Sequence, residues 1–236
     1  MVSVSGKTIM VQGATKRRRS RQGDRKKWWT QGFSSVEIQG GLRIVPFWES
    51  GISPDDRTSI VIDPGPAFGL GDHPTTIMAL ELLQKAFIEL RDLKATASVL
   101  DVGSGVGILS IAARLLGAHF AVAVDIDPVA VNVARRNCTV NRVIVGQESA
   151  EGVHLCVGGV ECVSSRFDLV MANLVAPLLL RIRKQLTDNS KNLLLISGIF
   201  ETMVDEVRQA YVTEGFEVVE QKSREEWRSM LLRRMF

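Results

Sequence analysis

The sequence predicts an α/β fold built on a mainly parallel sheet, because strand-like and helix-like segments alternate along most of the chain. Apolar runs of strand length fall at 98–102, 120–125, 153–157, 167–172 and 192–197. Segments typical of helices lie between or after them, at 107–117, 128–140, 174–186 and 202–214. Two last strands, near 217–222 and 228–234, leave no room for a helix between them, so they should form an antiparallel hairpin at the sheet edge.

The part of the chain before this alternation predicts a small β segment and a long helix. Residues 36–38 and 42–45 indicate a hairpin around two glycines, and Ser59–Ile62 indicates a further short strand. A helix should begin at Pro74, because apolar residues recur on one face from there. These residues are Ile77, Leu80, Leu83, Phe87 and Leu90.

A glycine-rich turn follows the first strand of the alternating region. Asp101 precedes Gly103, Gly105 and Gly107, and the predicted helix begins at once. Glycines at such a turn let a flat ligand lie against the backbone. A dinucleotide-binding fingerprint would need its third glycine at position 108, where the chain has Ile108. The spacing resembles motif I of the class I S-adenosylmethionine-dependent methyltransferases. Another nucleotide-binding α/β enzyme and a plain tight turn are the alternatives.

A second acidic residue follows the next strand. Asp125 ends an apolar run and lies twenty-two residues after Gly103, a spacing that places a carboxylate at the tip of the neighbouring parallel strand. A carboxylate there can accept hydrogen bonds from both ribose hydroxyls of an adenosine. The alternative is that Asp125 is a helix cap beside Asp127. We interpret Asp127 itself as the N-cap, because Pro128 follows it at the first helical position.

The segment 63–76 is rich in Gly, Pro and small polar residues, which favours a binding loop over an ordinary linker. Phe68 could cover the adenine or substrate channel, or equally belong to the core. Thr75 and Thr76 could donate hydroxyls to a cofactor or satisfy amides of the first helical turn. His73, just before the predicted helix, could act as a base, position a substrate or cap the helix.

Asn173 follows another apolar strand, at 167–172. Parallel-sheet enzymes carry their chemistry at the carboxyl ends of strands, which is where this side chain would emerge. Its amide oxygen can accept a hydrogen bond from a substrate amine and aim the nitrogen lone pair, and orientation is a large part of catalysis in an in-line displacement. The alternative is an N-cap on the following helix, and the two roles could coexist.

Composition excludes several classes of protein. No apolar stretch is long enough for a membrane span, and the N-terminus lacks the apolar core of a signal peptide. Three cysteines without C-x-x-C spacing predict packed thiols in a reducing compartment rather than disulfides. Three histidines without cysteine or carboxylate partners at ligand spacing predict no metal site. We therefore expect a cytoplasmic enzyme without a membrane partner.

Charge is distributed unevenly along the chain. Residues 1–27 hold nine basic residues and one acidic residue, whereas the remainder holds 20 basic and 25 acidic residues. A basic block without apolar periodicity is typically a solvated, disordered tail. Weak contact with RNA or the ribosome and an organellar transit-like segment are the alternatives.

Six segments together resemble the PrmA family, whose members methylate amino groups of ribosomal large-subunit protein eleven. The segments are LDVGSGVGILSIAA, VAVDIDPVAV, DPGPAFGLGDHPTT, FDLVMANLVAPLL, LLISGI and EEWRSMLLRR, and the similarity runs from about Trp28 to the C-terminus. The resemblance implies a Rossmann-like class I methyltransferase fold and S-adenosylmethionine as cofactor. It implies cofactor contacts at Thr76, Gly103, Asp125 and Asn173.

Two features depart from the family pattern. Leu70 stands where family members usually have a threonine in a Gly-Thr-Gly sequence, so a hydroxyl contact there would be lost. Family members also carry an N-terminal recognition domain, for which the 27 residues before Trp28 are too few. We therefore divide the chain into a basic tail at 1–27, a linker or small β segment at 28–62, and a methyltransferase domain at 63–236.

The resulting expectation is an S-adenosylmethionine-dependent N-methyltransferase acting on lysine or N-terminal amines of a protein, which the family suggests is ribosomal. Asn173 is the expected catalytic residue, with His73 assisting. Asp101, Gly105 and Gly107 join the four family positions as cofactor ligands, and Phe68 and Leu70 belong to the substrate loop. The alternatives are an RNA or small-molecule methyltransferase of the same fold and a noncatalytic RNA-associated assembly factor.

Overall fold

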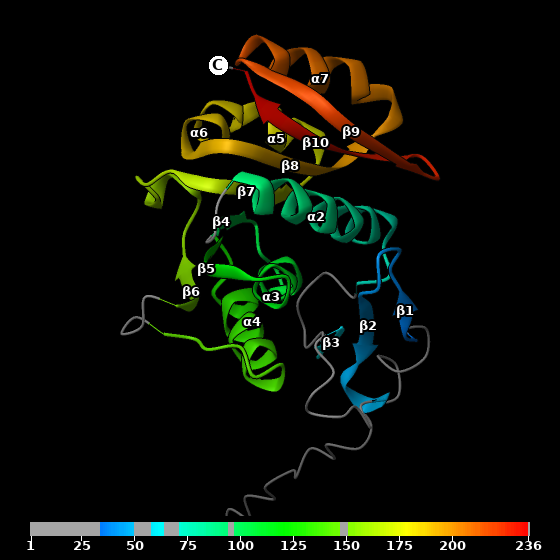
Figure 1. Cartoon of the computed structure of the whole chain (residues 1–236), viewed down its shortest axis with the longest axis vertical. Coiled ribbons are helices and arrows are strands. Elements are labelled where there is room, and N and C mark those ends of the chain that lie inside the picture. The colour runs from blue at the N-terminus through cyan, green and yellow to red at the C-terminus, as the bar shows by residue number, and fades with distance from the viewer. Residues whose placement is uncertain (1–33, 50–57, 64–70, 94–96, 147–150, 236) are drawn as a thin grey trace, which may run out of the picture. The chain divides into compact units, whose positions relative to one another are not determined.

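The computed structural model describes residues 34–49, 58–63, 71–93, 97–146 and 151–235. Within these ranges the backbone forms two sheets (Figure 1). The larger sheet has seven strands in the order β6-β5-β4-β7-β8-β10-β9, and the smaller has three in the order β1-β2-β3. The predicted α/β fold with a mainly parallel sheet is confirmed.

Five neighbouring strands of the large sheet run parallel to one another. They are β4 (Ala97–Val102), β5 (Ala118–Asp125), β6 (Gly152–Val157), β7 (Phe167–Asn173) and β8 (Ser190–Phe200). The last two strands, β9 (Phe216–Arg224) and β10 (Trp227–Arg234), are antiparallel to each other, and β10 is antiparallel to β8. The predicted hairpin at the sheet edge is therefore confirmed.

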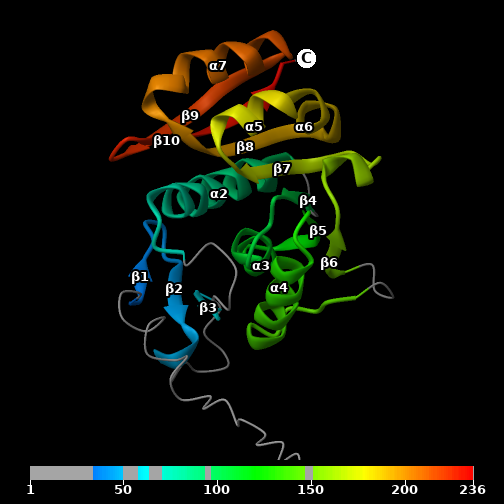
Figure 2. The same cartoon turned by 180° about the vertical axis from the view of Figure 1, so that it is seen from behind.

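Helices cover both faces of the large sheet (Figures 1 and 2). One face carries α2 (Pro74–Leu93), α3 (Ile108–Leu115) and α4 (Pro128–Val140), and the other carries α5 (Ala176–Arg181), α6 (Arg183–Asn189) and α7 (Val204–Thr213). Alternate strand residues enter two separate cores. In β4, for example, Val99 packs with α2 and α3, whereas Leu100 packs with the opposite helices. All five apolar residues predicted for one face of α2 are buried.

The small sheet packs on the same face as α2 and α3. It consists of β1 (Val36–Glu37), β2 (Arg43–Pro46) and β3 (Ser59–Ile62), where β1 and β2 form the predicted hairpin and β3 runs parallel to β2. Ile44, Ile60 and Ile62 are fully buried in the core that α2 and α3 share. Short 3-10 turns complete the described elements at η1 (Phe47–Glu49), η2 (Val160–Cys162) and η3 (Glu201–Met203).

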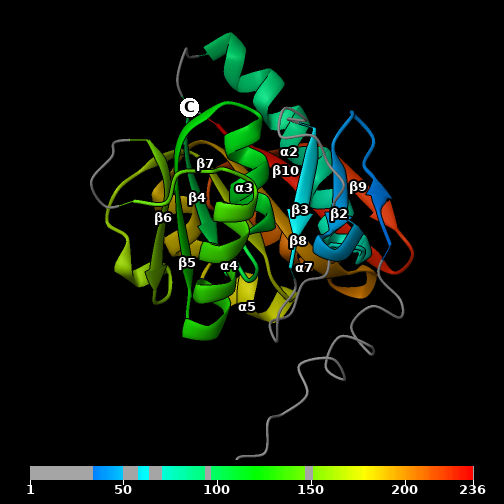
Figure 3. The same cartoon turned by 90° about the horizontal axis from the view of Figure 1, so that it is seen from below.

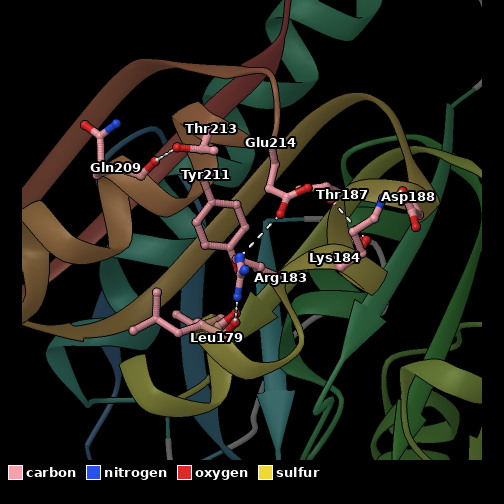
Figure 4. A network of polar contacts seen from close by, with 10 residues as sticks. Leu179, Arg183, Lys184, Thr187, Asp188, Gln209, Tyr211, Thr213 and Glu214 are labelled. Carbon is pink, nitrogen blue, oxygen red and sulfur yellow. Dashed lines mark hydrogen bonds and ion pairs between the residues drawn. The ribbon is translucent and has the colours of Figure 1, made fainter.

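The prediction of one helix over 174–186 is wrong in its start and in its continuity. The helix begins at Ala176, next to a proline whose missing amide is tolerated in a first helical turn, and it breaks at Ile182. In a continuous helix the Leu179 carbonyl would accept a hydrogen bond from the Arg183 amide. Instead it accepts one from the buried Tyr211 hydroxyl of α7, at 3.0 Å (Figure 4). A side chain inserted into the helical ladder explains the break.

The break separates α5, which faces the strand ends, from α6. Arg183, the first residue of α6, forms an ion pair of 3.3 Å with Glu214 just after α7 (Figure 4). Burial raises the pKa of the Tyr211 hydroxyl, which therefore stays protonated and remains a hydrogen-bond donor. These contacts fasten α5 and α6 to α7.

The prediction that the thiols are packed holds for one cysteine only. Cys138 on α4 is buried, but Cys156 and Cys162 are exposed. Cys156 lies in the edge strand β6, and Cys162 ends the short turn η2 that follows it, so neither is covered by a second layer.

Candidate functional site

A cavity of about 720 Å³ opens at the carboxyl ends of the parallel strands. The strand ends of β4, β5 and β7 contribute Asp101, Asp125 and Asn173, and these three strands are neighbours in the sheet. The cavity lining also includes the predicted residues His73, Thr75, Thr76, Gly103 and Gly105. The fold therefore gathers most of the predicted site residues around one space.

The glycine-rich turn has the backbone conformation that glycine favours, with φ of 73° at Gly103 and 83° at Gly107. A Cβ added at Gly103 would lie 2.5 Å from the Leu174 side chain, and one at Gly107 would lie 3.0 Å from the Ala134 Cβ. These two glycines thus allow the turn to pack against Leu174, just after β7, and against α4. Gly107 is not among the cavity-lining residues.

Asp125 holds the glycine-rich turn in place. Its Oδ2 accepts a hydrogen bond of 2.8 Å from the Gly105 amide, and its Oδ1 accepts one of 2.9 Å from the Asp127 amide. Asp127 caps α4, because its Oδ1 accepts from the Val129 amide at 2.8 Å. The predicted cap at Asp127 is confirmed, and Asp125 is not the N-cap.

Asp101 is a buried carboxylate beside the cavity. It is 1% exposed, and its Oδ2 accepts a hydrogen bond of 2.6 Å from the Ser110 hydroxyl. Burial raises the pKa of Asp101 to about 6, although the Ser110 bond favours the charged form, and the charge of Asp125 adds to the rise. At neutral pH this residue therefore places a poorly solvated negative charge next to the cavity.

We expect Asp101→Asn to stabilise the ligand-free protein at alkaline pH. The folded pKa lies above the ordinary value of 3.8, so the stability contribution of this group is present below that value and lost as pH rises through 6. The free energy of unfolding of the variant should exceed that of the wild type by up to about 3 kcal/mol near pH 8, and this difference should shrink toward pH 4. Urea unfolding across this range measures the effect, and a difference independent of pH would contradict it.

The first turn of α2 is fixed by His73. Its Nδ1 accepts a hydrogen bond of 3.3 Å from the Thr75 amide and lies 2.8 Å from the Thr75 hydroxyl, so the capping alternative is confirmed. Buried Ser197 on β8 donates to the Thr75 carbonyl at 2.8 Å. Together these contacts place Thr76 at the cavity wall.

Asn173 is the last residue of β7 and precedes the helix N-cap, Val175, by two residues. The alternative that Asn173 caps the following helix is therefore wrong. Its Nδ2 donates to the Thr76 Oγ1 at 3.4 Å, and no donor to its Oδ1 occurs in the described part of the chain. The amide oxygen therefore remains available at the cavity.

Several cavity-lining residues are not among those predicted from the sequence. Trp227, the first residue of β10, makes edge-to-face contacts with His73 at 5.2 Å and Phe200 at 5.5 Å between ring centroids. Its position could have been inferred, because an antiparallel strand starts at the edge where its parallel neighbour ends. Ser104 also lines the cavity, and its buried Oγ has no hydrogen-bond partner in the described structure. Nothing in the sequence singled it out.

The predicted substrate-loop residues Phe68 and Leu70 fall outside the described residues. Among the residues that are described, no cluster of three His, Cys, Asp or Glu side chains could hold a metal ion. No helix in the same ranges has the length and apolar character needed to cross a bilayer.

The parallel sheet, the glycine-rich turn and the acidic strand ends define a class I S-adenosylmethionine-dependent methyltransferase fold. A solved structure with this fold, a magnesium protoporphyrin IX methyltransferase from Synechocystis with bound S-adenosylmethionine, superimposes with a TM-score of 0.54 at 15% identity, covering 68% of this chain and 82% of that one. The chain belongs to the PrmA family, described as Ribosomal protein L11 methyltransferase, whose sequence profile matches residues 4–235.

Individual proteins similar to this chain carry the name of the family. Ribosomal protein L11 methyltransferase of Caldicellulosiruptor saccharolyticus is 39% identical over 209 residues, which cover 86% of this chain and 65% of that protein. The Dictyoglomus turgidum protein is 37% identical over 186 residues, covering 78% and 58%. The crystal structure of a ribosomal protein L11 methylase from Lactobacillus delbrueckii superimposes with a TM-score of 0.69 at 28% identity, covering 86% and 99%. The chain thus spans less than two thirds of the curated relatives named here.

Proposed function

We propose that this chain uses S-adenosylmethionine to methylate amino groups of a protein, at lysine side chains or an N-terminus. The observation that carries the proposal is the meeting of Asp101, Asp125 and Asn173 at the ends of three adjacent strands around one cavity. Two carboxylates suit a cationic nucleoside, and the Asn173 amide oxygen suits an amine. The activity, substrate and partners of the whole protein are part of this proposal.

The lining residues fit the cofactor chemically. Asp125 presents carboxylate oxygens that can accept from ribose hydroxyls while they also hold the turn, because each oxygen has more than one lone pair. Asp101 would face a positive charge of the cofactor, and the unpaired Ser104 Oγ would gain a partner on binding. When bound, S-adenosylmethionine supplies a methyl group activated by its sulfonium.

The acceptor amine must be neutral before it can attack. A lysine ammonium has an ordinary pKa near ~10.4, and an apolar wall lowers that pKa by disfavouring the charged form. Leu174, Val175 and Leu178 provide such a wall next to Asn173. Because the His73 Nδ1 is engaged at the helix N-terminus, we assign His73 the positioning of Thr76 and Trp227 rather than the role of a base.

We expect Trp227 to bind the acceptor side chain. Its indole is held by His73 and Phe200, and it can cover an alkyl chain or attract an ammonium. Trp227→Ala should raise KM for the acceptor about tenfold, an effect of about 1.4 kcal/mol, with little change in cofactor Kd. Trp227→Phe, which keeps an aromatic face, is the matched control, and its KM for the acceptor should lie between those of the wild type and Trp227→Ala. A cofactor Kd that rises as much as KM would contradict this assignment.

The acceptor that we propose is a ribosomal protein, encountered in the cytoplasm. Support comes from the names of the relatives, which are ribosomal protein methyltransferases. The basic segment 1–27 falls outside the described residues, and we keep its contact with nucleic acid as a proposal. Such a contact would bring the enzyme to ribosomal particles in a salt-dependent manner.

The test is transfer of a labelled methyl group. The purified chain is incubated with methyl-labelled S-adenosylmethionine and a ribosomal fraction from matched cells, and protein and RNA are then separated. We expect label in a protein, located by peptide mass spectrometry at a lysine or N-terminal amine. Label in RNA instead would favour the RNA methyltransferase, and no transfer with intact cofactor binding would favour the noncatalytic factor.

A further inference from the structure

Asn137 on α4 and Asn141, the C-cap of α4, contact the backbone of strand β3 and of the residue that follows it, as a neighbouring strand would. Asn141 Oδ1 accepts from the Val61 amide at 2.8 Å, and its Nδ2 donates to the Val61 carbonyl at 2.7 Å. Asn137 Oδ1 accepts from the Asp63 amide at 2.9 Å, and its Nδ2 donates to the Asp63 carbonyl at 3.1 Å. Each carboxamide thus pairs with both backbone groups of one residue.

The spacing of the two asparagines matches the spacing of their partners. Four residues of helix rise about 6 Å, and two residues of strand rise about 6.6 Å. Val61 and Asp63 are two apart, so their amides and carbonyls point to the same side of the chain. Strand β3 is at the edge of the small sheet and lies beside α4 (Figure 3). The asparagines therefore pair with the backbone groups of Val61 and Asp63 along this edge of the small sheet.

Asn137 makes one contact that Asn141 does not make. Its Nδ2 also donates to the Val106 carbonyl at 2.9 Å. Val106 lies in the glycine-rich turn and lines the cavity, whereas neither asparagine does. One turn earlier on α4, Ala134 packs against Gly107. The fully buried Asn137 side chain therefore joins the turn at the cavity to the residue that follows β3.

We infer that Asn137 is a positioning residue for the cavity, which sets the Val106 carbonyl of the glycine-rich turn in register with Asp63, while Asn141 secures strand β3 and the last turn of α4 without contacting the glycine-rich turn. The inference rests on the proposed function, because the occupant of the cavity is taken to be S-adenosylmethionine or its product. If so, the glycine-rich turn and the backbone at Asp63 are coupled through Asn137. A ligand that orders the turn should then also stabilise the backbone at Asp63. Loss of the Asn137 side chain should weaken ligand binding although Asn137 does not line the cavity.

Asn137→Ala and Asn141→Ala form a matched pair for the test. Each removes one carboxamide from β3, but only Asn137→Ala frees the Val106 carbonyl. Both should lower Tm, whereas the Kd for S-adenosylhomocysteine, measured by calorimetry, should rise about tenfold in Asn137→Ala and less than about twofold in Asn141→Ala. Equal changes of Kd in the two variants, or none in either, overturn the inference. Failure of the wild type to bind overturns the proposed function as well.

Hydrogen exchange on the wild-type protein tests the same coupling without a substitution that could prevent folding. S-adenosylhomocysteine should slow exchange of the Asp63 amide, which is bonded to Asn137. The Ile38 amide, which donates to the Leu42 carbonyl in the small hairpin, serves as the control and should exchange at an unchanged rate. Exchange at Asp63 that does not respond to the ligand overturns the inference.

Discussion

Asp125→Ala is expected to weaken S-adenosylmethionine binding about 100-fold, because hydrogen bonds to a charged partner contribute about 1.5–3 kcal/mol. The substitution removes the proposed partner of the ribose hydroxyls. It also removes the acceptor of the Gly105 amide at 2.8 Å and so loosens the glycine-rich turn before any ligand arrives. Calorimetric titration with S-adenosylhomocysteine measures the loss directly.

Asp127→Ala is the matched control for this prediction. It removes the side chain that caps α4, at a cost of about 1 kcal/mol in stability, but leaves both Asp125 hydrogen bonds in place because they come from backbone amides. We expect a lower Tm and a cofactor Kd close to that of the wild type. An Asp125→Ala variant that is folded and binds as tightly as Asp127→Ala would remove Asp125 from the cofactor site.

Asn173→Ala is expected to lower the rate of methyl transfer about 100-fold while changing cofactor affinity by less than about fivefold, because misorientation of an attacking group costs rate rather than binding. The amide oxygen has no donor in the described structure, so it can take one from an acceptor amine. Single-turnover kinetics at saturating cofactor separate the two effects.

Thr76→Val tests whether Asn173 itself must be held in place. The variant keeps the side-chain shape but removes the Oγ1 that lies 3.4 Å from the Asn173 Nδ2. We expect an intermediate loss of rate, about tenfold, since the amide oxygen is still present but less well oriented. A wild-type rate in folded Asn173→Ala would contradict the catalytic assignment whatever Thr76→Val does.

The arrangement of Asp101, Asp125 and Asn173 could be predicted because parallel strands end at the same edge of a sheet. A strand ending in an acidic or amide residue is visible in sequence, and neighbouring strands then bring such residues together. The cap at Asp127 and the buried face of α2 could also be predicted, since both depend only on local spacing.

Contacts between residues distant in sequence could not be predicted. The break at Ile182 depends on a hydroxyl from Tyr211, and the fixed position of Asp63 depends on Asn137, 74 residues later. Neither contact leaves a periodic signal. The packing role of Gly107 was hidden for the same reason, because its neighbour Ala134 is on another element. Tertiary packing, not local preference, decides these features.

We propose that the cavity at the strand ends binds S-adenosylmethionine and does not bind a dinucleotide. Calorimetry of the wild-type chain with S-adenosylhomocysteine and, separately, with NAD distinguishes the two kinds of ligand. We expect saturable one-to-one binding of S-adenosylhomocysteine and no comparable binding of NAD, because Ile108 stands where the dinucleotide fingerprint needs glycine and itself lines the cavity. Binding of NAD with equal or higher affinity, or failure of S-adenosylhomocysteine to bind, would show that this cavity is not an S-adenosylmethionine site.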